Sequence, residues 1–263
     1  MTGSTSAQPR DSISAAISAA ASKGRPALVG FMTAGFPDRA GFAESLRAIA
    51  SEAEVVEIGV PFSDPMADGA TIQRASFASL QGGFTLTWLL QELGSMQPRP
   101  QAPILLMSYL NPLLAFGLER LPEAAKQAGV AGFIIPDLPF EESADMRAAL
   151  DRAGIALVQM VTPVTPDARL QMLCAASQGF VYAVTMTGTT GKSVAVPDEI
   201  LGYMDRVKAM SPIPVCAGFG IRTAEHVTRM QGHVDGVVVG SALVEVLERR
   251  EDPAAFLRSL RLS

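Results

Sequence analysis

Eight short apolar runs, spaced along almost the whole chain, constrain the fold more than any other feature of the sequence. They are rich in Val, Ile, Leu and Phe and cover residues 27–33, 54–60, 103–109, 132–137, 155–161, 179–185, 213–219 and 236–240. Their apolar residues are nearly continuous instead of alternating with polar ones, which is typical of parallel strands that are buried on both faces. The runs therefore predict eight parallel strands.

The segments between these runs have the apolar spacing of amphipathic helices. The clearest are 42–50, 86–93, 121–128, 143–153, 168–176 and 200–209, and the segment 80–95 is long enough for two helical pieces. Strand–helix alternation repeated eight times predicts an α/β fold of the (β/α)8 type, a TIM barrel. An open, doubly wound sheet is the weaker alternative.

The N-terminal segment precedes the first strand and adds an element to this pattern. Ile13 and Ile17 lie four residues apart, so they predict an extra helix that plugs the bottom of the barrel or packs beside it. No linker rich in Pro, Gly or Ser interrupts the later repeats. We therefore expect a single domain over 1–263, in which 1–25 form a tail and the extra helix.

Composition excludes several classes of function. A net charge of −5 does not supply the basic surface that nucleic-acid binding requires, so any bound phosphate should be small. No apolar run approaches the ~18 residues of a membrane span, and no signal peptide is recognisable, so we expect no membrane association and a cytoplasmic protein. Cys174 and Cys216 lie in apolar stretches, which predicts reduced, buried thiols.

Three carboxylates lie within the second predicted strand or on the loop that follows it, the part of the barrel where chains of this type carry their chemistry. If Glu57 points into the barrel, desolvation raises its pKa toward the range that is useful for proton transfer; the alternative is a pair with a distant Arg. Asp68 lies on the following loop, so we expect it to stay ionised and to accept a hydrogen bond from a substrate N–H. Asp64 is expected to hold the turn by bonding backbone N–H groups.

Glycine-bearing turns follow the last two predicted strands. Gly218-Phe219-Gly220 and Gly240-Ser241 each lead into a helix, where backbone N–H groups can approach an anion. The agreement of two adjacent turns favours a phosphate site, although small residues also relieve crowding where a helix meets a strand. The loop 187–197 has two glycines and small hydroxylated residues, and it is predicted to be a mobile lid or else a connector without function.

The residue types that are absent from the strands limit the chemistry further. No lysine lies within a predicted strand, which disfavours a Schiff-base aldolase. The only histidines, His226 and His233, lie in or after the seventh helix of the alternation, away from the predicted active face, so we expect no metal site. Carbon–carbon bond chemistry in this chain would therefore depend on carboxylates alone.

The most specific motif is EIGVPFSDPMADG, which begins at Glu57 and ends at Gly69. It is accompanied by TAGFP at 33–37, NP at 111–112, PDLP at 136–139, AGFGI at 217–221 and VGSA at 239–242. Over about 10–262 the chain resembles the tryptophan synthase alpha chain family. The resemblance implies cleavage of indole-3-glycerol phosphate to indole and glyceraldehyde 3-phosphate, with Glu57 delivering a proton to indole C3 and Asp68 accepting the indole N–H.

The same resemblance implies which residues bind the substrate and which partner the chain has. The expected indole-pocket residues are Phe31, Tyr109, Ile134 and Tyr182, and the expected phosphate-binding residues are Gly191, Gly220, Gly240 and Ser241. Members of the family work with a β subunit, in an α2β2 assembly that the loop after the second strand contacts. Pyridoxal phosphate belongs to that partner, and no cofactor is expected in this chain.

Three positions depart from the family pattern. Ala70 stands where many members have proline, Met186 where some have arginine, and Thr189 where valine or isoleucine is more usual. These differences bear on loop closure and on coupling to a partner, and they leave both carboxylates in place. A stand-alone indole-3-glycerol phosphate lyase, a non-catalytic allosteric partner of a β subunit, and another phosphate-binding barrel such as a sugar-phosphate isomerase or epimerase remain as alternatives.

Overall fold

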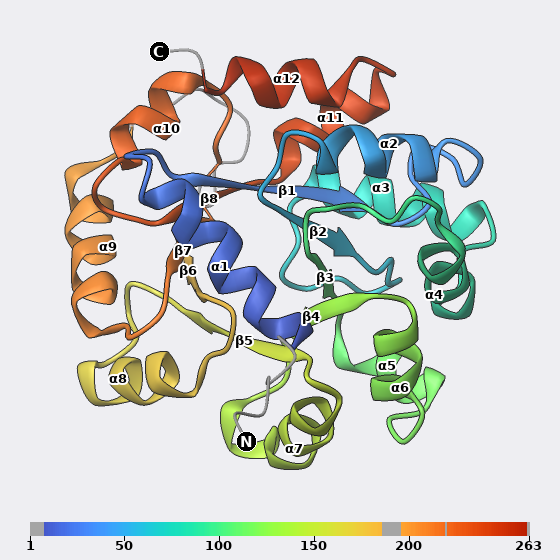
Figure 1. Cartoon of the computed structure of the whole chain (residues 1–263), viewed down its shortest axis with the longest axis horizontal. Coiled ribbons are helices and arrows are strands. Elements are labelled where there is room, and N and C mark those ends of the chain that lie inside the picture. The colour runs from blue at the N-terminus through green and yellow to red at the C-terminus, as the bar shows by residue number, and fades with distance from the viewer. Residues whose placement is uncertain (1–7, 186–195, 219, 262–263) are drawn as a thin grey trace, which may run out of the picture.

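Eight parallel strands close into a barrel in a computed structural model that describes residues 8–185, 196–218 and 220–261 (Figure 1). Each strand pairs with the next one in the chain, and β8 returns to pair with β1. The predicted (β/α)8 barrel is confirmed, and the open sheet is wrong. The strands are β1 (Ala27–Thr33), β2 (Val55–Gly59), β3 (Ile104–Met107), β4 (Val130–Ile134), β5 (Ala156–Val161), β6 (Val181–Val184), β7 (Val215–Gly218) and β8 (Gly236–Val239).

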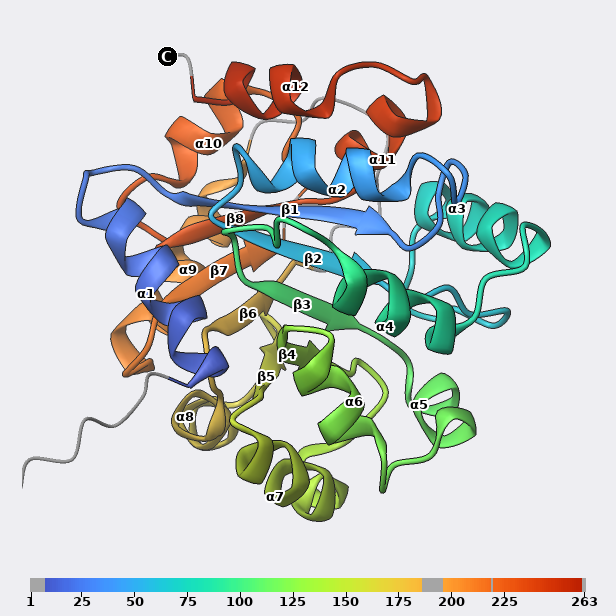
Figure 2. The ribbon, with the colours of Figure 1, turned by 45° about the vertical axis from the view of Figure 1, so that its right-hand side comes forward.

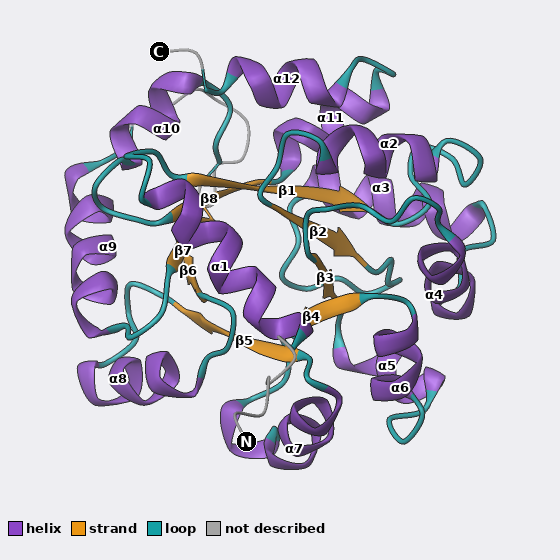
Figure 3. Ribbon diagram, in the orientation of Figure 1, coloured by secondary structure: helices purple, strands orange, loops and turns teal. Residues whose placement is uncertain are grey.

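Helices surround the barrel as an outer layer (Figure 3). They cover the outward face of each strand, so both faces of the sheet are buried, as the apolar runs predicted. Within the described residues the helices are α1 (Pro9–Ala21), α2 (Phe42–Ala50), α3 (Ala70–Gln81), α4 (Leu86–Ser95), α5 (Leu110–Phe116), α6 (Leu121–Gln127), α7 (Ala144–Ala153), α8 (Asp167–Ala176), α9 (Asp198–Met210), α10 (Ala224–Met230), α11 (Ser241–Glu248) and α12 (Pro253–Ser259), with a 3₁₀ turn, η1 (Phe140–Glu142).

Two of the predicted boundaries that differ from the structure do so for a clear local reason. Segment 80–95 holds only one whole helix, α4, because α3 already ends at Gln81 and Gly83 adopts a left-handed backbone conformation with φ of 78°. The fourth strand was expected at 132–137 but ends at Ile134. Pro136 has no N–H for the sheet ladder, and the chain turns there with a hydrogen bond from Leu138 N to the Ile135 carbonyl.

The N-terminal helix α1 covers the end of the barrel where the strands begin (Figures 1 and 2). Ile13 and Ile17 are completely buried, and α1 packs against β1, β2 and β4. Ser14 Oγ donates to the carbonyl of Gly179, just before β6, at 2.5 Å. Of the two arrangements expected for the extra helix, the structure therefore has the plug. In Figure 2 the strand arrows point away from it.

The barrel interior and the layer between strands and helices form one continuous apolar core. Cys174 and Cys216 are buried free thiols, as predicted. Across the described ranges, no helix is long and apolar enough to cross a membrane.

Candidate active site

The side chain of Glu57 points into the barrel from the middle of β2. On the neighbouring strand β1, a Cβ at Gly30 would contact Ile49 of α2, so position 30 faces the outer helix layer. Because successive residues of a strand face opposite sides, the adjacent Phe31 faces the barrel interior. Phe31 pairs with Glu57, and a Cβ at Gly59 would lie 2.6 Å from Cζ of the Phe31 ring. Glycine at position 59 therefore leaves room for this ring beside Glu57 on the inner face of the sheet.

Burial dominates the electrostatics of Glu57. Its side chain has no exposed surface, and neither carboxyl oxygen has a hydrogen-bond partner. Desolvation, with a smaller contribution from the charge of Asp68, raises the pKa of Glu57 to about 8. The alternative that Glu57 pairs with a distant Arg is therefore wrong, and the carboxyl group keeps its proton at neutral pH.

Asp68 lies on the loop between β2 and α3 and is only partly buried. Burial raises its pKa to about 6, while a hydrogen bond with the Tyr109 hydroxyl works in the opposite direction. The same hydroxyl accepts a hydrogen bond from Ala67 N at 2.8 Å, so Tyr109 holds the loop at two adjacent residues. Asp68 is therefore mainly ionised at pH 7, as expected for an acceptor.

Asp64 is exposed and has a different contact from the one predicted. Its carboxylate accepts a hydrogen bond from the adjacent Ser63 hydroxyl at 2.5 Å, and none of the described hydrogen bonds joins it to a backbone N–H. The expectation that Asp64 holds the turn through backbone N–H groups is wrong, because the neighbouring hydroxyl supplies the donor. The loop is fixed instead by Gln73, whose side-chain amide donates to the Asp68 carbonyl at 2.8 Å.

A small cavity of about 10 Å³ opens beside these groups, between the carboxyl ends of β1, β2 and β3 and helix α3. It is lined by Phe31, Gly59, Val60, Asp68, Ile72, Ser76, Met107, Ser108 and Tyr109. Two of the predicted pocket residues, Phe31 and Tyr109, are therefore part of its wall. Ile72 and Ser76 were missed, although their spacing of four residues places them on one face of α3.

The other two predicted pocket residues lie farther round the barrel. Tyr182 of β6 is buried, and its pKa is raised well above the ordinary value by burial and by the charge of Glu57. A Cβ at Gly218 would lie 2.5 Å from the Tyr182 ring, so this glycine makes space for the ring. Ile134 is completely enclosed at the end of β4 and does not line the cavity.

Open space lies above two of the predicted phosphate-binding turns. A Cβ added at Gly220 or at Gly240 would have no neighbour within 4 Å, and Gly220 is exposed. Gly240 is the N-cap of α11, whose first residue is Ser241, so free N–H groups are available there. Gly191, Met186, Thr189 and most of the predicted lid 187–197 lie outside the described residues.

The prediction that both histidines lie away from the catalytic end is wrong for His226, which lies in the first turn of α10 and accepts a hydrogen bond from Arg222 N, next to the Gly220 turn, at 3.3 Å. His233 follows α10 and contacts Asp205 at 2.7 Å. Among the residues that the structure describes, no three His, Cys, Asp or Glu side chains are grouped so that they could hold a metal ion. The site therefore presents a buried protonated acid, Glu57, and an ionised carboxylate, Asp68, close to an aromatic pocket.

Comparison with known proteins decides the family. The family model described as tryptophan synthase alpha chain matches residues 17–261. The chain belongs to the tryptophan synthase alpha chain family. It is 47% identical to the tryptophan synthase alpha chain of Bacillus thuringiensis over 211 residues, which are 80% of this chain and 82% of that protein. The alpha chain of Nitratidesulfovibrio vulgaris is 42% identical over 237 residues, 90% of this chain and 92% of the relative.

The solved structures agree with this family. The crystal structure of tryptophan synthase subunit alpha from Legionella pneumophila aligns with a TM-score of 0.86 at 28% identity, covering 97% of this chain and 98% of that one. As a tryptophan synthase alpha chain, the protein is a lyase that cleaves indole-3-glycerol phosphate in tryptophan biosynthesis.

Proposed function

We propose that Glu57 and Asp68 divide the work of indole-3-glycerol phosphate cleavage, Glu57 as the general acid/base and Asp68 as the carboxylate that stabilises charge on the indole nitrogen. The observation that carries this assignment is the separation of the two pKa values, about 8 for Glu57 and about 6 for Asp68. Between these values Glu57 holds a proton and Asp68 does not. Two titratable groups with environments that separate their pKa values are typical of acid/base pairs.

The first step of the proposed reaction uses the proton of Glu57. The carboxyl group gives this proton to indole C3, and positive charge develops at the ring nitrogen. Asp68, which accepts the N–H hydrogen bond, stabilises this charge more in the transition state than in the bound substrate.

The second step returns the proton to Glu57. The resulting Glu57 carboxylate accepts the proton of the hydroxyl on the glycerol carbon that is attached to C3. The C–C bond then breaks, its electron pair restores the aromatic indole, and the glycerol carbon becomes an aldehyde. The proton gained by C3 and the proton lost by the hydroxyl balance, so the cycle leaves Glu57 protonated as at the start.

The proposed substrate site has two halves. Phe31, Tyr109, Ile134 and Tyr182 form or support the indole pocket, and backbone N–H groups at Gly191, Gly220, Gly240 and Ser241 hold the phosphate. The aromatic wall of the cavity and the open space above Gly220 and Gly240 support this division.

We also propose a β subunit as the partner, in an α2β2 assembly in the cytoplasm, with pyridoxal phosphate in the β subunit. The similar Legionella pneumophila protein is a subunit of tryptophan synthase. The exposed large apolar side chains of this chain include Met66, Phe77, Leu114 and Val164, which lie on the loops and helices that follow β2, β3 and β5. Apolar side chains exposed at the catalytic end support a partner on that side of the barrel.

The deciding experiment measures indole release from indole-3-glycerol phosphate by the purified chain, alone and with a cognate β subunit. We expect slow release by the chain alone and a strong rise when the β subunit is present. Fast release that the β subunit does not change would indicate a stand-alone lyase. No release under either condition would indicate a non-catalytic partner and would contradict the roles given to Glu57 and Asp68.

A further inference from the structure

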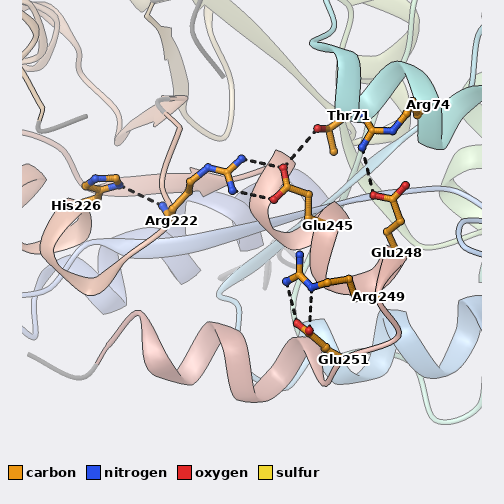
Figure 4. Close-up of polar contacts among 8 residues, drawn as sticks. All are labelled: Thr71, Arg74, Arg222, His226, Glu245, Glu248, Arg249 and Glu251. Atoms are coloured by element: carbon orange, nitrogen blue, oxygen red, sulfur yellow. Dashed lines mark hydrogen bonds and ion pairs between the residues drawn. The ribbon is translucent and has the colours of Figure 1, made fainter. Parts of the chain in front are cut away.

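A polar cluster outside the catalytic carboxylates joins three segments that lead into the site (Figure 4). Arg222, between β7 and α10, donates two hydrogen bonds of 2.8 Å to the carboxylate of Glu245 on α11. Thr71, in the first turn of α3, donates to the same carboxylate at 3.5 Å. Glu245 therefore contacts the segments that follow β7, β8 and β2.

The Arg222–Glu245 ion pair is less exposed and better aligned than an ordinary surface ion pair. Both side chains are about one-quarter exposed, 27% for Arg222 and 25% for Glu245. The two parallel hydrogen bonds match the planar guanidinium to the planar carboxylate, which fixes orientation as well as distance. The pair lowers the pKa of Glu245, so the carboxylate remains charged across the neutral range.

The neighbouring charges have partners of their own (Figure 4). Arg74 of α3 contacts Glu248 at 3.2 Å, and Arg249 donates to Glu251 at 2.8 Å. Glu245 is therefore the carboxylate of this cluster that holds Arg222.

Arg222 fixes the turn that contains Gly220. Ile221 is buried at 1% exposure, and the Arg222 N–H donates to Nδ1 of His226 at 3.3 Å. Thr223 then caps α10 by accepting a hydrogen bond from His226 N. The backbone of Gly220 is thus held from the C-terminal side by an apolar anchor, a side-chain acceptor and the guanidinium pair.

Glu245 fixes the other proposed phosphate-binding element. It lies one turn after Ser241 in α11, so its carboxylate is rigidly related to the N-terminus of that helix. The Arg222–Glu245 pair consequently sets the separation between the Gly220 turn and the Gly240-Ser241 turn. A phosphate held by backbone N–H groups from both turns requires this separation to be constant, because each N–H must point at the same small anion.

We infer that Arg222 and Glu245 are positioning residues for phosphate recognition, which hold the Gly220 turn and the N-terminus of α11 as one preformed anion site. The inference rests on the proposed phosphate site and adds two residues that do not touch the substrate. The contact with Thr71 connects the same pair to α3, which begins two residues after Asp68. Through Thr71, the pair thereby connects the phosphate site to the loop that carries Asp68.

The test compares Arg222→Met, Glu245→Gln and the double variant with the wild-type enzyme. Each variant is measured for kcat and KM with indole-3-glycerol phosphate, and for inhibition by glycerol 3-phosphate, which reports on the phosphate site without the chemical step. We expect KM and the inhibition constant to rise together by about tenfold in each single variant, with kcat within about twofold of wild type. Because the two residues act as one pair, the double variant should show no greater rise than the larger single effect.

The matched control is Glu248→Gln, which removes the ion pair with Arg74. This pair joins α11 to α3 as well, but it is more exposed, at 43% and 56%. We expect KM, kcat and the inhibition constant of this variant to equal those of wild type. Thermal unfolding of each variant verifies that it is folded at the assay temperature.

Three results would contradict the inference in distinguishable ways. Normal inhibition of the wild type together with unchanged KM in Glu245→Gln and Arg222→Met would overturn the positioning role alone. A wild-type enzyme that cleaves its substrate but is not inhibited by glycerol 3-phosphate would overturn the proposed phosphate site, and the positioning role with it. Multiplicative effects in the double variant would show that the two residues do not act as a pair.

Discussion

Glu57 has a carboxyl group with no solvent exposure and no hydrogen-bond donor from the described residues. Its pKa of about 8 means that the folded chain retains a proton which the unfolded chain, with an ordinary value of 4.5, has already lost at neutral pH. The contribution of this group to stability is therefore fully present below pH 4.5 and is lost as the pH rises toward 8. The enzyme maintains an acid at this position at the expense of stability.

Replacement of Glu57 by Gln should separate these two effects. We expect Glu57→Gln to lower kcat by about 10³-fold or more, because the amide cannot exchange a proton with indole C3. The same variant should gain stability relative to wild type, with a difference that grows from about pH 5 to about pH 8 and reaches roughly 4 kcal/mol. Indole release and urea unfolding at the two pH values measure both quantities. Near-full turnover by Glu57→Gln would refute the acid/base assignment.

The two carboxylates together should give a bell-shaped dependence of kcat/KM on pH. Activity requires Asp68 ionised and Glu57 protonated, so it should fall below about pH 6 and above about pH 8. In Asp68→Asn the residual activity, lower by about 10²-fold, should lose the acidic limb. The alkaline limb should move to lower pH, because the charge of Asp68 no longer raises the pKa of Glu57. An unchanged alkaline limb would contradict the electrostatic coupling of the pair.

At the scale of single elements, helix α1 contributes to stability at the end of the barrel opposite the catalytic groups. Ile17→Ala removes a completely buried side chain and should destabilise the fold by about 2–4 kcal/mol. Because α1 lies away from the carboxyl ends of the strands, kcat should remain unchanged at temperatures where the variant is folded. The exposed Ser18→Ala in the same helix is the control, with an expected change within about 0.5 kcal/mol. A large loss of kcat in folded Ile17→Ala would show that α1 reaches the active site.

Elements with a strong pattern of their own were predictable from the sequence, and those set by tertiary contacts were not. The eight strands carry continuous apolar runs, and α2 matches its predicted range at both ends. Helix α3 was not anticipated, because its apolar face toward the barrel is short and mixed with serines such as Ser76. The end of β4 was misplaced because an apolar run does not reveal where Pro136 turns the chain.

The candidate site was predictable to a similar extent. Position in the strand–helix alternation was sufficient to place Glu57 in the second strand of the barrel. The contact between Tyr109 and the Asp68 loop was not, since it joins residues about 40 positions apart through a side chain. The donor to the Asp64 carboxylate was also misjudged, because an aspartate in a turn has several nearby donors and the sequence does not rank them.

At the scale of the whole molecule, the barrel closes only when β8 pairs with β1, so the first and last strands depend on each other. The proposal of one domain over 1–263 therefore predicts a single cooperative unfolding transition, with coincident midpoints by circular dichroism and by the fluorescence of Trp88. Two resolved transitions would contradict it. Trp88 of α4 packs against Phe42 and Phe84, so it reports on the helix layer while circular dichroism reports on the whole fold.

The position of α1 has a consequence for substrate entry and product release. Within the described residues, a helix crosses one end of the barrel and a packed core lies behind it, so the substrate and both products are expected to pass through the opposite end. Both products must therefore leave through the open end of the barrel before the next substrate molecule can enter there. A protein that binds at the open end would control the order in which indole and glyceraldehyde 3-phosphate leave, without contacting Glu57 or Asp68.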